Sequence, residues 1–207
     1  VSHRDCILDV FFGTDYHSHL GTRRGGMAAY DQTAGLQREI HNIENSPFRT
    51  KFEGVLGEMK GCAAIGCISD TDPQPLLIRS VLGTYAICTI GIINNAETLL
   101  RQYLSFSGGH FEAMSGGKVN SNELISALID QKSSFAEGIR FAQDMIEGTA
   151  SILILKDDGH LIAARDKLGR LPIILEKNAE GFCVTFEDYA GEKLGYEYYR
   201  ELGPGEV

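Results

Sequence analysis

The chain of 207 residues is predicted to have an α+β fold. Two amphipathic helices, one following Asn120 and one over Phe135–Ile146, stand together between two groups of strand-like segments. Because helices and strands do not alternate one by one, we expect sheets packed against helices rather than βαβ units. Neither a G-x-G-x-x-G nor a G-x-x-x-x-G-K-S/T motif occurs, so the sequence does not predict a Rossmann or P-loop nucleotide site.

The first third of the chain contains short apolar segments separated by polar stretches. Ile7–Phe12 is an apolar segment that runs into Gly13, whereas residues 37–59 are polar and are broken at Asn45-Ser46-Pro47. Leu56–Ile68 is apolar and punctuated by glycines, which predicts a buried strand that enters a polar loop.

The stretch Cys67–Leu100 is predicted to organise the fold. It contains a polar loop, the corner Gln74-Pro75-Leu76-Leu77, apolar strand segments around Gly91 and then a helix start. A glycine before a helix start allows a close backbone approach, and backbone N–H groups at such a place can stabilise a developing negative charge. Gly91 is therefore a candidate oxyanion site, although its neighbours Ile90 and Ile92 provide no polar side chain.

Three helices are predicted from apolar spacing and from signals at their ends. A short amphipathic helix over Thr98–Phe106 is followed by a loop over residues 108–118. The segments Asn120–Glu123 and Ser134–Glu137 resemble capping boxes at the starts of the next two helices. Gly148 is predicted to end the last of the three.

Two β-hairpins are predicted after residue 150. Ser151–Lys156 and His160–Arg165 are joined by Asp157-Asp158-Gly159, and an Asp-Gly step supplies the positive φ angles that a tight turn needs. Leu171–Lys177 and Phe182–Phe186 form the second hairpin.

The composition excludes several classes of partner. A formal net charge of -9 argues against a nucleic-acid or anionic membrane surface, because both require a positive field. No apolar run approaches the roughly 20 residues that span a bilayer. The five cysteines form no C-x-x-C motif and are odd in number, which favours reduced thiols over a disulfide framework. We therefore expect a cytoplasmic protein without nucleic-acid or membrane partners.

Three short motifs are candidate ligand sites. Arg23-Arg24-Gly25-Gly26 combines cations with a flexible backbone, which suits an anion or a carboxylate; a solvated turn is the alternative. His17 with His19, or Cys62 with Cys67, could ligate a metal. Neither pair has further ligands at suitable spacing, so ordinary side-chain roles are favoured and no metal or cofactor is predicted.

Five sequence blocks occur in a fixed order across most of the chain: Arg24-Gly25, Gln74–Ser80, Gly91 with Asn95-Ala96-Glu97, Ala164–Asp166 with Gly169-Arg170 and Pro172, and Glu201–Glu206. Together these blocks resemble the glutaminase half of amidophosphoribosyltransferase, a class II glutamine amidotransferase of the N-terminal nucleophile hydrolase superfamily. The resemblance implies a four-layer αββα sandwich and, in active members, hydrolysis of glutamine to glutamate and ammonia.

The resemblance also implies a mechanism and a set of partners. An N-terminal cysteine attacks the amide carbon, and its own α-amino group serves as the base because that group titrates near neutrality. Arg24 and Gly25 are implied as substrate-binding residues and Gly91 as the backbone donor to the oxyanion. The implied partners are a glutamine-like amide or amino acid, a phosphoribosyltransferase domain in the same longer chain, and further copies in a homo-oligomer.

The sequence departs from this family at most polar positions of the implied site. The family's His-Asn-Gly-Asn corresponds to Thr89–Ile92, so an alkyl side chain replaces the amide of the oxyanion hole. Loss of one such donor costs about 3 kcal/mol of transition-state stabilisation. The loop Cys67–Asp70 offers no cation where the family has an arginine, and the family's aspartate aligns with Ser121 or nearby. Arg24 remains as the matched cation.

Cys6 is a candidate nucleophile, with an ordinary cysteine as the alternative. No glycine follows Cys6, and it precedes Arg24 by fewer residues than the roughly 25 of the family. On that spacing the nucleophile lies upstream of Val1. We therefore expect residues 1–207 to be a single glutamine amidotransferase-like domain that lacks its first strand and any following phosphoribosyltransferase domain.

Three functions remain open at this point. The first is hydrolysis of glutamine to supply ammonia to a transferase half. The second is a catalytically inactive pseudo-glutaminase that acts as a binding or regulatory module. The third is another N-terminal nucleophile hydrolase with a different amide substrate. The substituted polar residues favour reduced or absent glutaminase activity.

Overall fold

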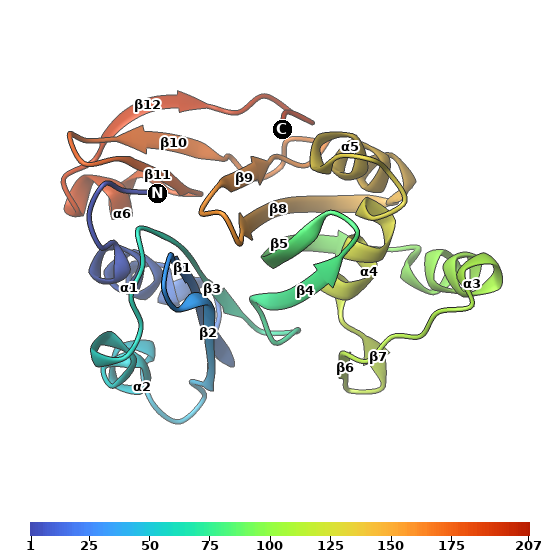
Figure 1. Ribbon diagram of the computed structural model, residues 1–207, viewed down its shortest axis with the longest axis horizontal. Coiled ribbons are helices and arrows are strands. Elements are labelled where there is room, and N and C mark those ends of the chain that lie inside the picture. The colour runs from blue at the N-terminus through green and yellow to red at the C-terminus, as the bar shows by residue number, and fades with distance from the viewer.

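The computed structural model describes residues 1–207, with the side chain of Ser115 left out of the description. Figure 1 shows how helices and strands follow one another along the chain. The helices are α1 (Ile7–Tyr16), α2 (Phe48–Phe52), α3 (Ala96–Ser107), α4 (Ser121–Ile129), α5 (Phe135–Met145) and α6 (Asp188–Lys193), with 3-10 turns η1 (Ser18–Leu20) and η2 (Val55–Gly57). The strands are β1 (Arg24–Asp31), β2 (Gly35–Asn42), β3 (Ala63–Ser69), β4 (Leu76–Ser80), β5 (Gly83–Ile93), β6 (Met114–Ser115), β7 (Lys118–Val119), β8 (Gly148–Lys156), β9 (Leu161–Ala164), β10 (Ile174–Lys177), β11 (Phe182–Thr185) and β12 (Glu197–Glu201).

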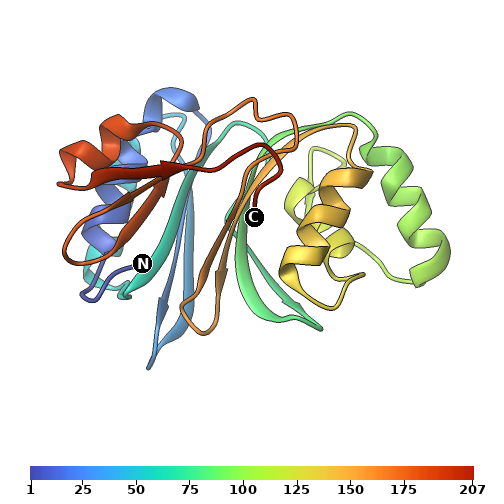
Figure 2. The same ribbon diagram turned by 90° about the horizontal axis from the view of Figure 1, so that it is seen from above.

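The elements form four layers. The larger sheets have the strand orders β2-β1-β3, β4-β5-β8-β9 and β11-β10-β12. In Figure 2, the sheets that contain β1 and β5 stand face to face, with α1, α2 and α6 on one outer side and α3, α4 and α5 on the other. The predicted α+β class and αββα sandwich are therefore confirmed.

Alternation of side chains along the strands builds three apolar cores. In β1, Met27 points to the core under α1 and α2, whereas Ala28 points to the core between the sheets. In β5, Ile87 points to α4 and α5, whereas Ala86 points to the core between the sheets. Successive side chains of a strand lie on opposite faces, so each central strand contributes to two cores.

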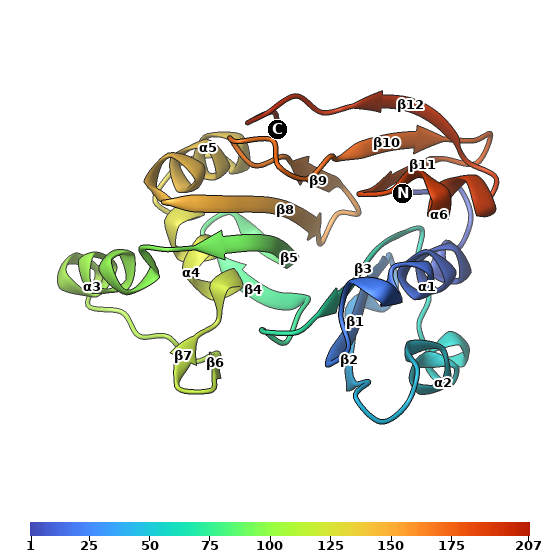
Figure 3. The ribbon, with the colours of Figure 1, turned by 180° about the vertical axis from the view of Figure 1, so that it is seen from behind.

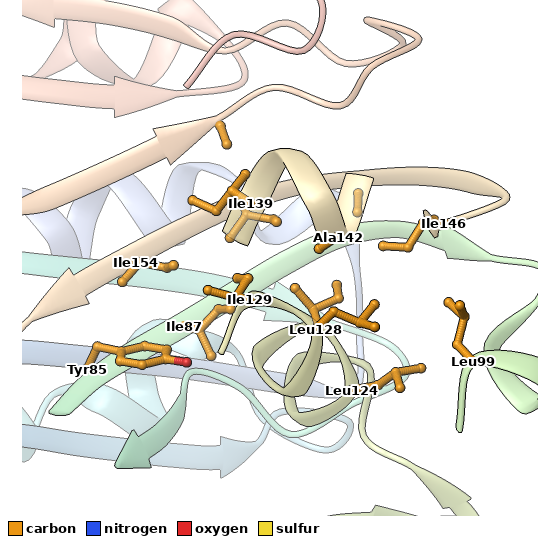
Figure 4. Close-up of a cluster of buried hydrophobic side chains, with 14 residues drawn as sticks. Tyr85, Ile87, Leu99, Leu124, Leu128, Ile129, Ile139, Ala142, Ile146 and Ile154 are labelled. Carbon is orange, nitrogen blue, oxygen red and sulfur yellow. The ribbon is translucent and has the colours of Figure 1, made fainter. Parts of the chain in front are cut away.

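The largest core lies between the β4-β5-β8-β9 sheet and helices α4 and α5. Figure 4 shows Leu128 and Ile129 of α4 close to Ile87 of β5, with Ile139 of α5 beside them. The apolar stripes predicted for these two helices are thus core residues. Burial of each such side chain stabilises the fold by about 2 kcal/mol.

The starts of α4 and α5 agree with the predicted caps in part. The side chain of Asn120 accepts a hydrogen bond from the backbone N–H of Asn122, and Ser134 accepts one from Glu137. In a complete capping box the Glu123 carboxylate would also accept from the Asn120 backbone N–H, but here it accepts from the backbone N–H groups of residues 112 and 113. Helix α5 also ends at Met145, before the predicted stop at residue 148.

Both predicted hairpins are confirmed, and two polar segments contain more structure than expected. β8 pairs with β9 and β10 pairs with β11, each antiparallel. Residues 37–59, described above as polar and broken, contain most of β2 and all of α2. The predicted loop over residues 108–118 contains β6 and the start of β7. α2, β6 and β7 have at most five residues, which are too few to show a period, and β2 has no fully buried position to mark one of its faces.

The first two residues connect two sheets. Val1 exchanges backbone hydrogen bonds with Phe182 of β11, at 3.0 and 2.9 Å. The Ser2 N–H donates to the Cys62 carbonyl, just before β3, at 2.7 Å, and Ser2 forms an antiparallel bridge with Gly181. Figures 1 and 3 place the N-terminus beside β11 and above α1. The chain therefore enters the fold between the edges of β3 and β11.

Candidate functional site

A cavity of about 310 Å³ lies between the two facing sheets and reaches α1 and α6. Its walls come from β3, β5, β8 and β11, together with the two helices. Most of the lining side chains are apolar, such as Ile65, Ile68, Ile90, Leu153 and Val184. Its ionisable side chains include the carboxylates of Asp9 and Asp70 and the imidazole of His17, and the α-amino group of Val1 also lies in a lining residue. No lysine or arginine lines it among the residues that the structure describes.

Gly91 lies near the end of β5 and lines this cavity. Its φ of +154° is unfavourable for other residues, and a Cβ atom here would lie 2.0 Å from the Thr149 carbonyl oxygen of β8. The predicted close backbone approach therefore exists, and its partner is the neighbouring strand. Ile90 lines the cavity beside Gly91, whereas the Ile92 side chain is 69% exposed.

The Gln74 side chain forms hydrogen bonds with the backbone N–H and C=O of Thr89, two residues before Gly91. Its Oε1 accepts from the Thr89 backbone N–H at 2.9 Å, and its Nε2 donates to the Thr89 carbonyl at 3.2 Å. The Asn122 Nδ2 of α4 also donates to Gln74 Oε1, at 3.1 Å. The Gln74 oxygen thus accepts two hydrogen bonds and its Nε2 donates one, so this amide holds the strand and the start of α4 beside the cavity.

An acidic loop forms part of the cavity wall, with Ser69, Asp70 and Thr71 in the lining. Asp70 Oδ1 accepts from the backbone N–H groups of Thr22 at 2.6 Å and Arg23 at 3.1 Å. The hydrogen bond from Thr22 is the main reason that the pKa of Asp70 is lowered from its ordinary value. Asp72 accepts from the backbone N–H of Ser121 at 3.0 Å, at the start of α4. Asp70 therefore lines the cavity, whereas Asp72 holds the start of α4.

The other predicted binding residues, Arg24 and Gly25, lie at the start of β1 and outside the cavity lining. A Cβ atom at Gly25 would lie 2.5 Å from the Phe48 ring, so this glycine allows α2 to pack on β1. The neighbouring Arg23 pairs with Glu44 at 3.8 Å on the surface. The motif therefore combines a packing role with solvated cations at this edge.

Cys6, the candidate nucleophile, precedes α1 and is 3% exposed. Burial raises the pKa of its thiol to about 11, and a thiol that stays protonated is a poor nucleophile. Cys67, Cys88 and Cys183 also line the cavity. Burial and contact with Cys67 raise the pKa of Cys88, and burial raises the pKa of Cys183 to about 12.

His17 connects α1 to β11 instead of binding a metal with His19. Its Nε2 lies 3.0 Å from the Thr185 Oγ1, and its Nδ1 lies 2.7 Å from the Gly13 carbonyl oxygen. His19 pairs with Glu187 at 3.2 Å. Across the described residues, no three His, Cys, Asp or Glu side chains are grouped so that they could hold a metal ion. Within the same residues, no helix is both long and apolar enough to cross a membrane.

The amino-acid pattern indicates the loop and the glycine of this site but not its polar connections. Gln74 was part of a recognised corner, yet its bond to Asn122 joins residues 48 positions apart. The link between His17 and Thr185 spans 168 positions. No periodic pattern or spacing rule predicts such contacts, because they depend on how the layers are placed together.

Comparisons with known proteins agree on one family. The sequence model described as a glutamine amidotransferase domain matches residues 62–190. Amidophosphoribosyltransferase of Bacillus subtilis (strain 168) is 27% identical over 216 residues, which cover 99% of this chain and 43% of the relative. The Methanocaldococcus jannaschii amidophosphoribosyltransferase is 26% identical over 208 residues, which cover 96% and 42%.

Two solved structures show the same fold. Glutamine phosphoribosylpyrophosphate amidotransferase from B. subtilis, complexed with ADP and GMP, superposes with a TM-score of 0.84 at 25% identity, covering 98% of this chain and 44% of that one. A structure described as the allosteric regulatory enzyme of purine biosynthesis has a TM-score of 0.81 at 25% identity, covering 95% and 43%. The chain thus spans less than half the length of the relatives that it matches.

Proposed function

We propose that this chain, which belongs to the glutamine amidotransferase domain family, is a pseudo-glutaminase. By this we mean a domain that keeps the fold of the family without hydrolysing glutamine. It is homologous to the glutaminase half of amidophosphoribosyltransferase and has the N-terminal nucleophile hydrolase fold. We propose that it acts as a binding or regulatory module of a longer amidophosphoribosyltransferase-like protein.

The observation that carries this proposal is the sign of charge in the cavity. Free glutamine has an α-carboxylate and an α-ammonium group, and a site that holds it needs a cation for the carboxylate. The acidic and basic side chains that line the cavity, among the described residues, are Asp9, Asp70 and His17; Val1 lines it too, and its α-amino group donates to the Phe182 carbonyl. Asp70 keeps its negative charge at neutral pH, because two backbone N–H groups stabilise the ionised form. The α-carboxylate of glutamine would therefore be repelled by the Asp70 carboxylate.

The reacting end of glutamine would also lack stabilisation. Ile90 presents an alkyl side chain beside Gly91, and both polar groups of the Thr89 backbone are bound to Gln74. A tetrahedral oxyanion could therefore receive at most backbone donors. A missing donor costs about 3 kcal/mol, which lowers the rate by a factor of roughly 100 to 1,000.

We further propose that an extended segment upstream of Val1 lies between β3 and β11 as the first strand. The antiparallel bridge of Ser2 with Gly181 directs the preceding residues along β11 towards Thr185, and Ser2 bonds to the β3 side at Cys62. Apolar side chains of the cavity, such as Ile65 and Val184, lie along this path. Apolar walls suit a strand of protein better than a charged amino acid.

We also propose that a phosphoribosyltransferase domain follows in the same longer chain. The matched part covers 43% and 42% of two relatives that are named amidophosphoribosyltransferase. These relatives are therefore more than twice as long as the part that matches this chain. In such a chain the present domain would contact the transferase half and influence it without delivering ammonia from glutamine.

The proposal is tested by measuring glutamine hydrolysis in the full natural chain. Glutamine labelled with ¹⁵N at the side-chain amide is incubated with the protein, and labelled ammonia and glutamate are quantified over time. We expect labelled ammonia to be released no faster than in buffer without protein. The B. subtilis amidophosphoribosyltransferase serves as the positive control. Isothermal titration with glutamine is expected to give no heat of binding, because the α-carboxylate has no cationic partner.

Release of labelled ammonia faster than in buffer alone would overturn the proposal and favour an active glutaminase. One observation supports that second candidate: Gly91 stays at the cavity wall, where its backbone could face an oxyanion. If release were found, the catalytic cysteine would have to lie upstream of Val1, because Cys6 is buried and its pKa is raised to about 11.

A further inference from the structure

Glu176 of β10 is a buried carboxyl group without a partner. Its side chain is 0% exposed, and neither Oε1 nor Oε2 has a hydrogen-bond partner among the described residues. Buried carboxylates in proteins are nearly always paired with a cation or with several donors, because an isolated buried charge is very unfavourable. The packing around Glu176 is therefore suited to the neutral, protonated form.

Helix α6 covers this carboxyl group directly. A Cβ atom at Gly191 would lie 1.5 Å from the Glu176 Oε2, so only a glycine lets the helix backbone come this close. Gly191 is itself buried. Figure 3 shows α6 lying against the β10-β11 hairpin, next to α1. The position of α6 and the charge of Glu176 must therefore be coupled.

The groups that face Glu176 do not offset a negative charge. From α6, Asp188 and Glu192 act on it, and both are acidic. From β11, the neighbouring residue in register is Cys183, and from β12 it is Tyr198. From α1, Asp9 acts on Cys183 and accepts a hydrogen bond from Tyr196.

The lysines of β10 and α6 contact aromatic rings. Lys177 lies over the ring of Tyr199 at 4.5 Å, and Lys193 lies over the ring of Tyr189 at 5.3 Å. Burial, reinforced by the two α6 carboxylates, raises the pKa of Glu176 to about 7. Its ionisation is thus moved from the acidic range to near neutrality.

We propose that Glu176 is a proton-dependent latch for helix α6: the neutral carboxyl group allows α6 to pack on β10 and β11, and its ionisation loosens the helix. The consequence reaches the cavity, because Ala190 and Gly191 of α6 form part of its wall. Loosening of α6 therefore opens the cavity at the wall that Ala190 and Gly191 form. This latch does not depend on whether the domain hydrolyses glutamine.

The direction of the pH effect follows from proton linkage. The open state has an ordinary glutamate, which ionises near pH 4.5, and the closed state holds its proton up to about pH 7. Between these two pH values the closed state therefore binds more protons than the open state. The opening equilibrium constant rises as the pH increases through this range, and it becomes constant at higher pH. Between pH 5 and pH 7.5, the opening equilibrium is expected to increase on the order of 50-fold.

Amide hydrogen exchange of residues 188–194 in the full natural chain tests the latch. After correction for the intrinsic exchange rate at each pH, the protection of α6 is expected to fall on the order of 50-fold between pH 5 and pH 7.5. In Glu176→Gln, which keeps the shape without the titration, protection should stay constant. Glu197→Gln, an exposed position on β12, is the matched control and should follow the wild type.

Identical pH profiles for the wild type and Glu176→Gln would overturn the latch, and so would a wild-type profile that does not change with pH. If Glu176→Gln does not fold, the double variant Asp188→Asn/Glu192→Gln decides instead. It leaves Glu176 in place and removes the two facing charges, so its transition should move to lower pH. A transition at the wild-type pH would contradict the proposed electrostatic coupling.

Discussion

Gly26 in the middle of β1 shows how a single residue determines the shape of the site. A Cβ atom at this position would lie 1.9 Å from the carbonyl oxygen of Gln74 and 2.7 Å from the Pro75 ring. The same carbonyl accepts a hydrogen bond from the Cys67 thiol at 3.1 Å. Gly26 therefore allows the loop that carries Gln74 to lie on β1. Because Gln74 lines the cavity, this glycine also determines the position of that wall.

Gly26→Ala is expected to destabilise the protein by about 3 kcal/mol, because backbone atoms of the loop would have to move. The free energy of unfolding in urea measures this, with an unchanged slope of free energy against urea. Gly54→Ala is the control: its φ of -65° and ψ of -32° are helical, and no heavy atom lies within 4 Å of the added Cβ. A loss below about 0.5 kcal/mol in Gly26→Ala would contradict the packing described here.

At the scale of elements, the Gln74 side chain ties three pieces of the chain together. It bonds to the backbone of Thr89 in β5 on both sides and receives a bond from Asn122 in α4. Asn120 adds a bond from its Nδ2 to the Pro73 carbonyl at 3.0 Å. The loop, the strand and the helix start are therefore one hydrogen-bonded unit beside the cavity.

Gln74→Ala is expected to cost about 3 kcal/mol of stability, because it leaves buried polar groups of Thr89 and Asn122 without partners. Thermal unfolding should show a lower midpoint, and exchange of the Thr89 amide should become faster. Gln102→Ala on the exposed surface of α3 serves as the comparison and should change stability by less than about 0.5 kcal/mol. Equal effects of both substitutions would refute the role of this network.

At the scale of the whole molecule, the two sheets face each other around small side chains. Ala28, Ala63 and Ala86 fill much of the space between them. The outer faces of the sheets carry larger residues that pack against helices, such as Met27 of β1 and Ile87 of β5. The cavity lies where this arrangement leaves room between β3 and β11, beside Val1.

The proposed first strand predicts a change in the stability of the whole domain. A chain that includes the natural residues upstream of Val1 should unfold at higher temperature than residues 1–207 alone, because a strand in this place buries apolar surface and pairs with β11. The cavity should also bind less of a dye that fluoresces in apolar sites, such as 1-anilinonaphthalene-8-sulfonate. Equal midpoints and equal dye binding for the two chains would contradict a strand at this position.

The sequence predicts the local architecture well where the pattern is long and regular. The stripes of α4 and α5 and the Asp157-Asp158-Gly159 turn depend on neighbours within a few residues, so local rules apply to them. The ordered blocks from Arg24-Gly25 to Glu201–Glu206 indicated the family, which the comparisons show. Short elements such as α2 and β6 were missed, because a few residues carry no period.

By itself, then, the sequence determined the α+β class and the family. Only the tertiary structure decided that Gln74 pairs with Thr89, that carboxylates line the cavity, and that Glu176 lies unpaired beneath Gly191. The physical reason is the range of the interactions. Periodicity and capping act between near neighbours, whereas burial and charge depend on which distant segments are packed together.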